Sequence, residues 1–181
     1  MNTEKWLQEI DQLTQSFIIA FENLSEKQPN WKPNPDTWSI AQNIDHLITL
    51  NSSYFPIVEK AAEQRMNLPW HAKLKFITRF FGRILLKSVS PEATKKMKTF
   101  SIWEPSESLI SKGILERFEI NQQKIEAVDI RFKGFAGKGS CHFYSPANKN
   151  LVYKLSAAFD IIVAHEQRHL NQAKGILLNL P

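Results

Sequence analysis

Apolar side chains recur every three or four positions over several long stretches of the sequence, a spacing typical of amphipathic helices. The first stretch extends from about Thr3 to Leu24. The second begins after Ser39, which forms an S-x-x-Q capping box with Gln42. Pro56 lies inside this second stretch, so we expect the helix to kink there or to end near Phe55.

Two further helices are predicted in the second half of the chain, from Ser106 to about Phe132 and from about Asn148 to Leu178. Between the second and third helices, WHAKLKFITRFFGRILLKS has the pattern of a basic amphipathic helix. Its apolar side is expected to consist of Leu74, Ile77, Phe81, Ile84 and Leu85. We therefore predict an all-α, antiparallel four-helix bundle with an inserted basic amphipathic segment, formed as one domain by residues 1–181.

The composition is that of an ordinary globular protein, with 43% hydrophobic and 23% charged residues. A single cysteine, Cys141, excludes an intramolecular disulfide and is compatible with a reducing compartment. No apolar run approaches the roughly 20 residues that a membrane span requires. The first residues do not form a basic start followed by an apolar run, so we expect no signal peptide and a cytoplasmic location.

The formal net charge is +5, and much of the positive charge lies between Lys73 and Lys98. This stretch contains eight Lys or Arg and a single acidic residue, Glu92. Phe76 and Phe80 lie among these charges. The stretch could bind nucleic acid or a membrane surface. We favour a solvated helix face packed on the bundle, because the apolar residues are assigned to one side and no nucleic-acid-binding motif is present.

Candidate chemistry is concentrated in AHEQRHLNQ, residues 164–172, where His165, Glu166 and His169 form an H-E-x-x-H pattern. At 100° per residue, both histidines project from the middle of the face that carries Ala158. Two imidazoles four residues apart can reach one metal ion, whereas the alternative is a pair of core histidines with local hydrogen bonds. Gln172 lies close to the same direction.

A zinc protease needs a third ligand after this motif. The twelve residues that follow His169 contain no His, Asp, Glu or Cys, so the protease interpretation fails. A third ligand must come from upstream, where His46, His71 and His142 are available. His46 lies two turns into the second predicted helix and can point between helices, which favours a site with three nitrogen ligands and open positions.

Three segments resemble the DinB-like (DinB/YfiT) superfamily: TWSIAQNIDHLI, KKMKTFSIWEPSE and DIIVAHEQRHLNQA. The resemblance implies a four-helix bundle with an up-down-down-up arrangement and a divalent metal, nickel, zinc or iron, held by His46, His165 and His169. Similar proteins include thiol transferases that use bacillithiol or mycothiol, and a mycothiol-dependent isomerase. A homodimer is a further expectation from the resemblance.

We therefore expect a metal-dependent enzyme that transfers a low-molecular-weight thiol to an electrophilic small-molecule substrate. The alternatives are a metal-dependent hydrolase and a non-catalytic binding protein of the same fold. Glu166 is the candidate catalytic base, although its position at the edge of the apolar face also suits an exposed or supporting charge. Gln172 is the candidate substrate-binding residue, or else a helix-packing amide. Cys141 is expected to be inert.

Overall fold

Four long helices form the body of the protein in the computed structural model. The model describes residues 3–63, 65–93, 98–107, 109–110, 113–133 and 141–181, with the backbone alone for 129–133. The bundle consists of α1 (Thr3–Phe21), α2 (Ile40–Ala62), α4 (Ile114–Lys133) and α5 (Leu155–Leu177). Helices α1 and α2 each pack against both α4 and α5, so the bundle has a square cross-section.

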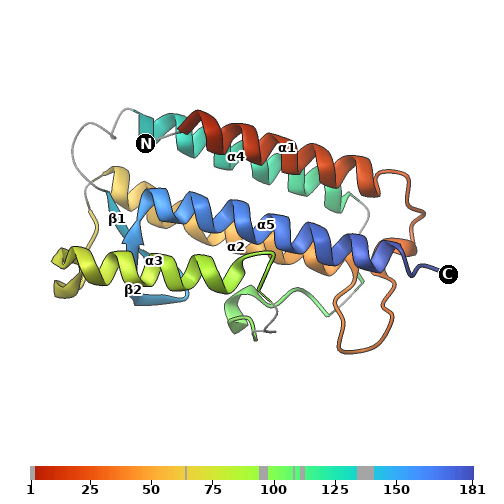
Figure 1. Ribbon diagram of the computed structural model, residues 1–181. Helices are drawn as coiled ribbons and strands as arrows, with labels where there is room; N and C mark the ends of the chain where they lie inside the picture. Colours follow the sequence, from red (N-terminus) through yellow and green to blue (C-terminus); the bar gives the residue numbers. More distant parts are fainter. Residues whose placement is uncertain (1–2, 64, 94–97, 108, 111–112, 134–140) are drawn as a thin grey trace.

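The helices run in an up-down-down-up order (Figure 1). Helices α2 and α4 point the same way, so the chain must travel back along the bundle between them. Helix α3 (Lys75–Val89) makes most of this return and packs against α5. The predicted four-helix bundle with an inserted basic amphipathic helix is thereby confirmed. Residues 94–97 of the basic stretch lie outside the described residues.

The core forms where the apolar faces of the four helices meet. Helix α1 buries Ile10 and Phe17 completely, and the Phe17 ring contacts the buried Phe118 ring of α4, with 4.7 Å between centroids. At the other end, the Trp6 indole stacks on Phe159 of α5. Burying such faces is the main source of stability for helices of this kind. In the described part of the chain, no helix has the length and apolarity needed to cross a bilayer.

Helix α2 continues through Pro56 to Ala62, so of the two predicted outcomes, a kink at Pro56 or an end near Phe55, the second is wrong. Pro56 is exposed, which lets its ring point to solvent while Ile57 and Val58 are buried immediately after it. The apolar burial of the last two turns offsets the roughly 3 kcal/mol that a proline costs inside a helix.

A β-hairpin replaces the start of the last predicted helix. Strand β1 (His142–Ser145) pairs in antiparallel register with β2 (Asn148–Lys154), and α5 begins only at Leu155. The prediction of a helix from Asn148 is therefore wrong. The hairpin buries Tyr153, whose hydroxyl lies 2.6 Å from the hydroxyl of Tyr54 in α2, and this tertiary contact favours the strand.

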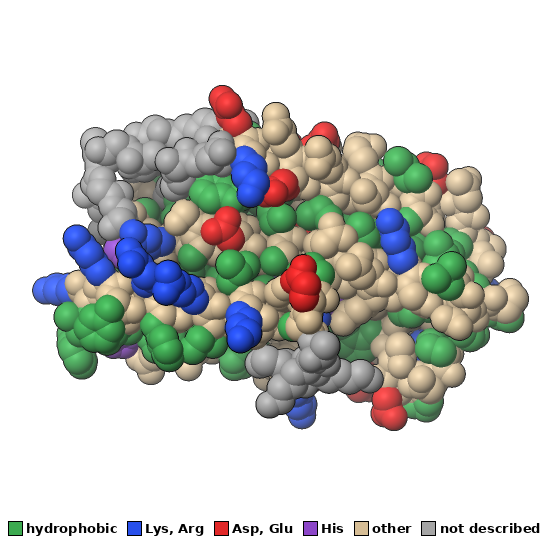
Figure 2. All heavy atoms as spheres, viewed as in Figure 1, with side chains coloured by type: hydrophobic (Ala, Val, Ile, Leu, Met, Phe, Trp, Pro, Cys, Tyr) green, Lys and Arg blue, Asp and Glu red, His purple; other side chains and the backbone are tan. Residues whose placement is uncertain are grey.

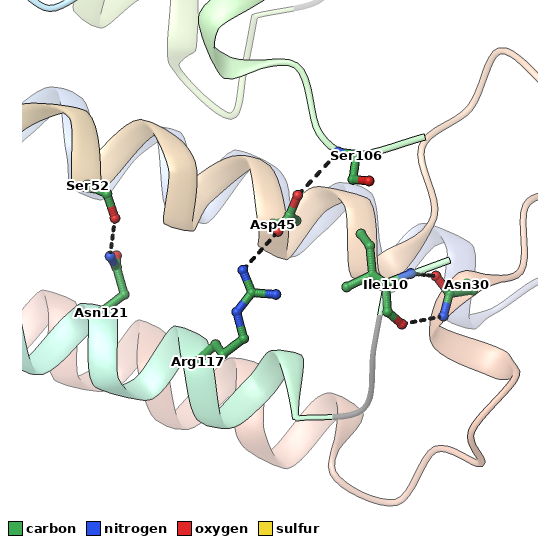
Figure 3. Close-up of polar contacts among 7 residues, drawn as sticks. All are labelled: Asn30, Asp45, Ser52, Ser106, Ile110, Arg117 and Asn121. Atoms are coloured by element: carbon green, nitrogen blue, oxygen red, sulfur yellow. Dashed lines mark hydrogen bonds and ion pairs between the residues drawn. The ribbon is translucent and has the colours of Figure 1, made fainter. Parts of the chain in front are cut away.

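The helix predicted from Ser106 begins at Ile114 instead. Upstream of it, the side chain of Asn30 binds both backbone groups of Ile110, accepting from its N–H at 2.9 Å and donating to its carbonyl at 3.0 Å (Figure 3). Those groups are consequently unavailable to a helix. Gly113, with φ of 83°, supplies the left-handed residue before α4. Among the described residues, the connections also hold three short 3-10 helices, η1 (Gln28–Asn30), η2 (Trp70–Lys73) and η3 (Ser101–Trp103).

Two glycines give a matched test of how α3 packs. A Cβ at Gly82 would lie 3.1 Å from the Cβ of Ala157 in α5, whereas a Cβ at Gly175 would meet nothing within 4 Å. We expect Gly82→Val to lower the free energy of unfolding by about 1–3 kcal/mol through overpacking. Gly175→Ala should raise it by about 0.5–1 kcal/mol, because it removes backbone entropy from the unfolded chain. Urea titrations measure both, and an unchanged stability in Gly82→Val would contradict the close approach of α3.

Candidate metal centre

The site lies between α2 and α5, which run antiparallel and in contact. The predicted capping box is present at the start of α2: the Gln42 N–H donates to Ser39 Oγ, and the Ser39 N–H donates to Gln42 Oε1, both at 3.1 Å. This cap defines where α2 begins and thus the direction in which His46 points. His165 and His169, one turn apart on α5, face it.

The three imidazoles meet through their Nε2 atoms. Nε2 of His165 lies 3.4 Å from Nε2 of His46 and 3.1 Å from Nε2 of His169. All three side chains are buried, with exposed fractions of 2% for His46, 8% for His165 and 5% for His169. In the described part of the chain, these residues form the group of His, Cys, Asp or Glu side chains whose ligand atoms are close enough to share one ion. The structure therefore brings together the three histidines selected from the sequence.

The opposite ring nitrogens of two imidazoles are already bonded. Nδ1 of His46 lies 2.6 Å from the carbonyl oxygen of Trp103, and Nδ1 of His169 lies 2.7 Å from Oδ1 of Asn43. The Asn43 amide is oriented by its NH₂ group, which donates to the carbonyl of Ser39 at 2.8 Å. Both acceptors are oxygens without hydrogen, so Nδ1 is the protonated nitrogen in both rings.

This assignment leaves unshared electron pairs facing one another. With hydrogen on Nδ1, the Nε2 atoms of neutral His46 and His169 carry lone pairs. A hydrogen on Nε2 of His165 can point at only one of them, so at least one pair of nitrogens would remain in repulsive contact. One cation placed among the three atoms removes the conflict entirely. Two nitrogens bound at about 2.1 Å to a tetrahedral ion lie about 3.4 Å apart, close to the spacing observed here.

The surroundings keep the imidazoles uncharged and ready to bind a cation. Burial lowers the pKa of His46, and it lowers the pKa values of His165 and His169 well below the usual range for histidine. The guanidinium of Arg168 acts in the same direction on the two histidines of α5. Neutral imidazole is the form that binds metal, so little proton displacement opposes binding near pH 7. The donor set therefore fits a transition-metal ion.

Aromatic rings enclose the cluster on one side. The half-buried Trp38 indole stacks on His169, with 5.9 Å between ring centroids and 18° between planes, and tilts against His46 at 4.9 Å. Trp103 is buried, and its indole N–H donates to Ser53 of α2 at 3.0 Å. This bond holds in place the Trp103 backbone carbonyl that accepts the hydrogen bond from His46. These contacts restrict the imidazole rings to the orientation in which their Nε2 atoms meet.

Glu166 is fully buried, so of the two settings expected for a non-catalytic Glu166, an exposed or a supporting charge, the exposed one is wrong. Its Oε1 accepts from the side-chain amide of Asn51 at 2.9 Å. Burial raises the pKa of Glu166 to about 7, opposed by the neighbouring amides of Gln122 and Asn51. Its carboxylate is not a member of the group that could share an ion with the three histidines. The glutamate of the H-E-x-x-H pattern thus faces the bundle interior.

The other candidate residues lie elsewhere. Gln172 is exposed on α5, and its role in substrate binding stays a prediction. The ring Nε2 of His71 bonds the carbonyl of Asn150 in β2 at 2.9 Å. Burial raises the pKa of the Cys141 thiol, in keeping with an inert cysteine. Asp45 is partly buried and binds Arg117 of α4 and the Ser106 N–H, both at 3.3 Å (Figure 3).

Sequence reasoning missed Asn43 and the carbonyl of Trp103. A signal for Asn43 was present, since a polar residue at helical spacing among Ile40, Ile44 and Leu47 requires a buried partner. The Trp103 carbonyl carries no side-chain signal, because its role depends on how the connection between α3 and α4 folds across α2.

A four-helix bundle with three buried histidines converging from two helices defines a class of candidate metalloprotein. The family model described as the DinB superfamily matches residues 9–112, more than half of the chain. The protein belongs to the DinB superfamily. The matched region includes His46, whereas His165 and His169 lie beyond it. These two histidines are assigned to the same site because their ring nitrogens lie next to that of His46 in the structure. No curated protein and no solved structure matches the chain.

Asn43 provides a test of the hydrogen bond behind His169. We expect Asn43→Ala to weaken Zn²⁺ binding by about 10- to 100-fold, the usual effect of losing a partner that orients a ligating histidine. Competition with a chromophoric chelator measures the affinity. Asn51→Ala is the matched control, because Asn51 is also a buried asparagine of α2 but its amide bonds Glu166. An affinity in Asn43→Ala equal to that of the parent protein would contradict the role.

Proposed function

We propose that the protein is an enzyme that uses a divalent metal ion bound by His46, His165 and His169. The observation that carries the proposal is the meeting of three buried Nε2 atoms, two of them in rings whose Nδ1 atoms already donate to oxygens. Membership in the DinB superfamily agrees with a metal site. Histidines that bind a metal through one ring nitrogen usually donate a hydrogen bond to an oxygen through the other, and two of these imidazoles have that arrangement.

The donor set limits the choice of metal. Three imidazole nitrogens suit zinc, nickel or iron(II), whereas magnesium and calcium prefer oxygen ligands. Three protein ligands leave positions open, which is typical of catalytic rather than structural ions. Because the ligands are neutral, a bound ion keeps its full charge and lowers the pKa of a thiol or water that reaches it.

We favour transfer of a low-molecular-weight thiol, such as bacillithiol, to an electrophilic small molecule. The charge of Arg168 acts on His165 and His169, so the surroundings of the imidazoles favour an anion such as a thiolate. The chain does not provide this thiolate itself, because Cys141 is outside the histidine group and its pKa is raised. The half-buried indole of Trp38 offers an apolar surface beside the histidines for the organic part of a substrate.

Hydrolysis is the second candidate, and the state of Glu166 favours it. A carboxyl group with a pKa of about 7 can accept a proton at neutral pH, as a catalytic base must. The hydrogen bond from Asn51 supports a positioning role instead, in which Glu166 holds α5 against α2. A non-catalytic binding protein of the same fold is the third interpretation, and it requires no metal.

Elemental analysis of protein purified without a metal-affinity tag tests the site directly. We expect about one equivalent of zinc, nickel or iron per chain, and loss of that metal in His46→Ala and His169→Ala because each removes one of three ligands. Glu166→Gln should retain the metal, since its carboxylate lies outside the ligand group. Wild-type protein that is metal-free and cannot be loaded with any of these ions would exclude the proposal.

Replacement of the metal by Co²⁺ tests the thiol. We expect bacillithiol or L-cysteine to produce a near-ultraviolet band of the kind that arises from sulfur-to-cobalt charge transfer, because a thiolate occupies an open position. The same additions to cobalt-treated His46→Ala protein are the control and should produce no band. A spectrum that responds to neither thiol in the loaded wild-type protein would contradict thiol transfer and leave hydrolysis as the better candidate.

A further inference from the structure

Helix α3 exposes a row of large apolar side chains that the bundle does not use. Phe76, Phe80 and Ile84 are 71%, 58% and 49% exposed, and they lie at successive intervals of four along the helix. Trp70, in η2 just before α3, is 75% exposed. Single exposed apolar residues are common, whereas a row of this kind marks a contact surface.

The packing of α3 leaves this row outside. The helix buries Thr78 and Gly82, and Gly82 allows α3 to approach Ala157 of α5 closely. Phe80 and Ile84 each lie two residues from Gly82, which is about 200° around a helix, so they point away from the bundle. The prediction that Ile84 shares the packed side of the helix is therefore wrong. Helix α3 has apolar residues on two opposite faces.

Ring contacts connect Trp70 to this row. The Trp70 indole contacts the His71 ring at 5.7 Å, His71 contacts Phe81 at 6.5 Å, and Phe81 contacts Phe80 at 5.9 Å, all between ring centroids. His71 is held in place by its bond to the Asn150 carbonyl. These contacts thus connect the exposed Trp70 of η2 with the exposed Phe80 of α3.

Basic residues run along the edge of the apolar row. Each apolar residue is directly preceded by a cation, in the pairs Lys75–Phe76, Arg79–Phe80 and Arg83–Ile84. Lys73 and Lys87 extend the basic row, and residues 70–91 contain no Asp or Glu. All five cations are exposed, and none pairs with a carboxylate among the described residues. Lys and Arg side chains gather over α3 beside hydrophobic ones at the left of the molecule (Figure 2).

We propose that this α3 surface, formed by Trp70, Phe76, Phe80 and Ile84 with the five cations, docks the protein on an anionic lipid bilayer. Aromatic and aliphatic side chains would enter the interfacial region, and the adjacent Lys and Arg would contact lipid phosphates. The row of apolar residues and the row of cations lie side by side on one helix, which is the pattern of helices that lie in the plane of a membrane interface.

The charge distribution favours lipid over other partners. A second copy of the chain, docked through the same surface, would bring five cations against five cations. Nucleic acid would neutralise the cations and stack its bases on the aromatic rings, but it offers no apolar layer for the aliphatic side chain of Ile84. An anionic bilayer provides both a negative surface and an apolar layer beneath it. The proposal is independent of the metal site and of the reaction.

Co-sedimentation of the full chain with vesicles tests the proposal. We expect binding to vesicles that mix phosphatidylcholine with phosphatidylglycerol, weakening as salt rises, and little binding to phosphatidylcholine alone. Arg79→Gln with Arg83→Gln should lower the partition coefficient about 25-fold, since each basic residue near the surface contributes about fivefold. Phe76→Ser with Phe80→Ser should abolish binding at physiological salt while leaving the net charge unchanged.

Matched control variants distinguish binding through the α3 surface from nonspecific binding to vesicles. Lys124→Gln with Lys174→Gln removes two exposed cations from α4 and α5, and Ile120→Ser with Leu178→Ser removes two exposed apolar residues elsewhere. Both controls should bind the mixed vesicles as the wild type does. No binding to anionic vesicles, or equal losses in controls and test variants, would overturn the proposal. The proposal would also be overturned if the wild-type protein formed oligomers that dissociate in Phe76→Ser with Phe80→Ser. Binding to an oligonucleotide without binding to vesicles would overturn it as well.

Discussion

Three imidazole Nε2 atoms directed at one buried point are the constraint on which the site depends. Neutral imidazoles cannot hold their Nε2 atoms 3.1 and 3.4 Å apart without a cation or a shared proton to offset the repulsion. Hydrogen bonds on the opposite side of two rings hold this arrangement: the Trp103 carbonyl accepts from His46, and the Asn43 amide oxygen accepts from His169. Burial then disfavours imidazolium, so that a metal ion is the better cation for this position.

The up-down-down-up order of the bundle explains how one connection serves two surfaces. Because α2 and α4 are parallel, the chain between them must return along the bundle. On this return, α3 packs against α5 and leaves its basic and apolar outer face free. The same connection then brings η3 against α2, where the Trp103 carbonyl accepts a hydrogen bond from Nδ1 of His46. The inserted segment therefore completes the histidine cluster as well as forming the α3 surface.

Polar groups occupy the interior of the bundle next to the histidines. Glu166 and Asn51 bond one another in the core, and Asn43 bonds both His169 and the turn that begins α2. Buried polar groups cost stability unless they are paired, so these bonds specify one alignment of α5 against α2. A bound metal would add its binding free energy to that alignment.

The sequence by itself determined the features that depend on neighbours along the chain. Helical periodicity and the Ser39–Gln42 capping box located the four helices, and the 100° turn of a helix placed His165 and His169 on one face. Tertiary structure decided what depends on distant partners. Asn30 removes Ile110 from the helix that the pattern predicts, and β1 converts residues 148–154 into a strand. Burial of Ile57 and Val58 carries α2 past Pro56, and Asn51 draws Glu166 into the core. In each case a contact between residues far apart in the chain outweighs the local preference, and no local pattern encodes it.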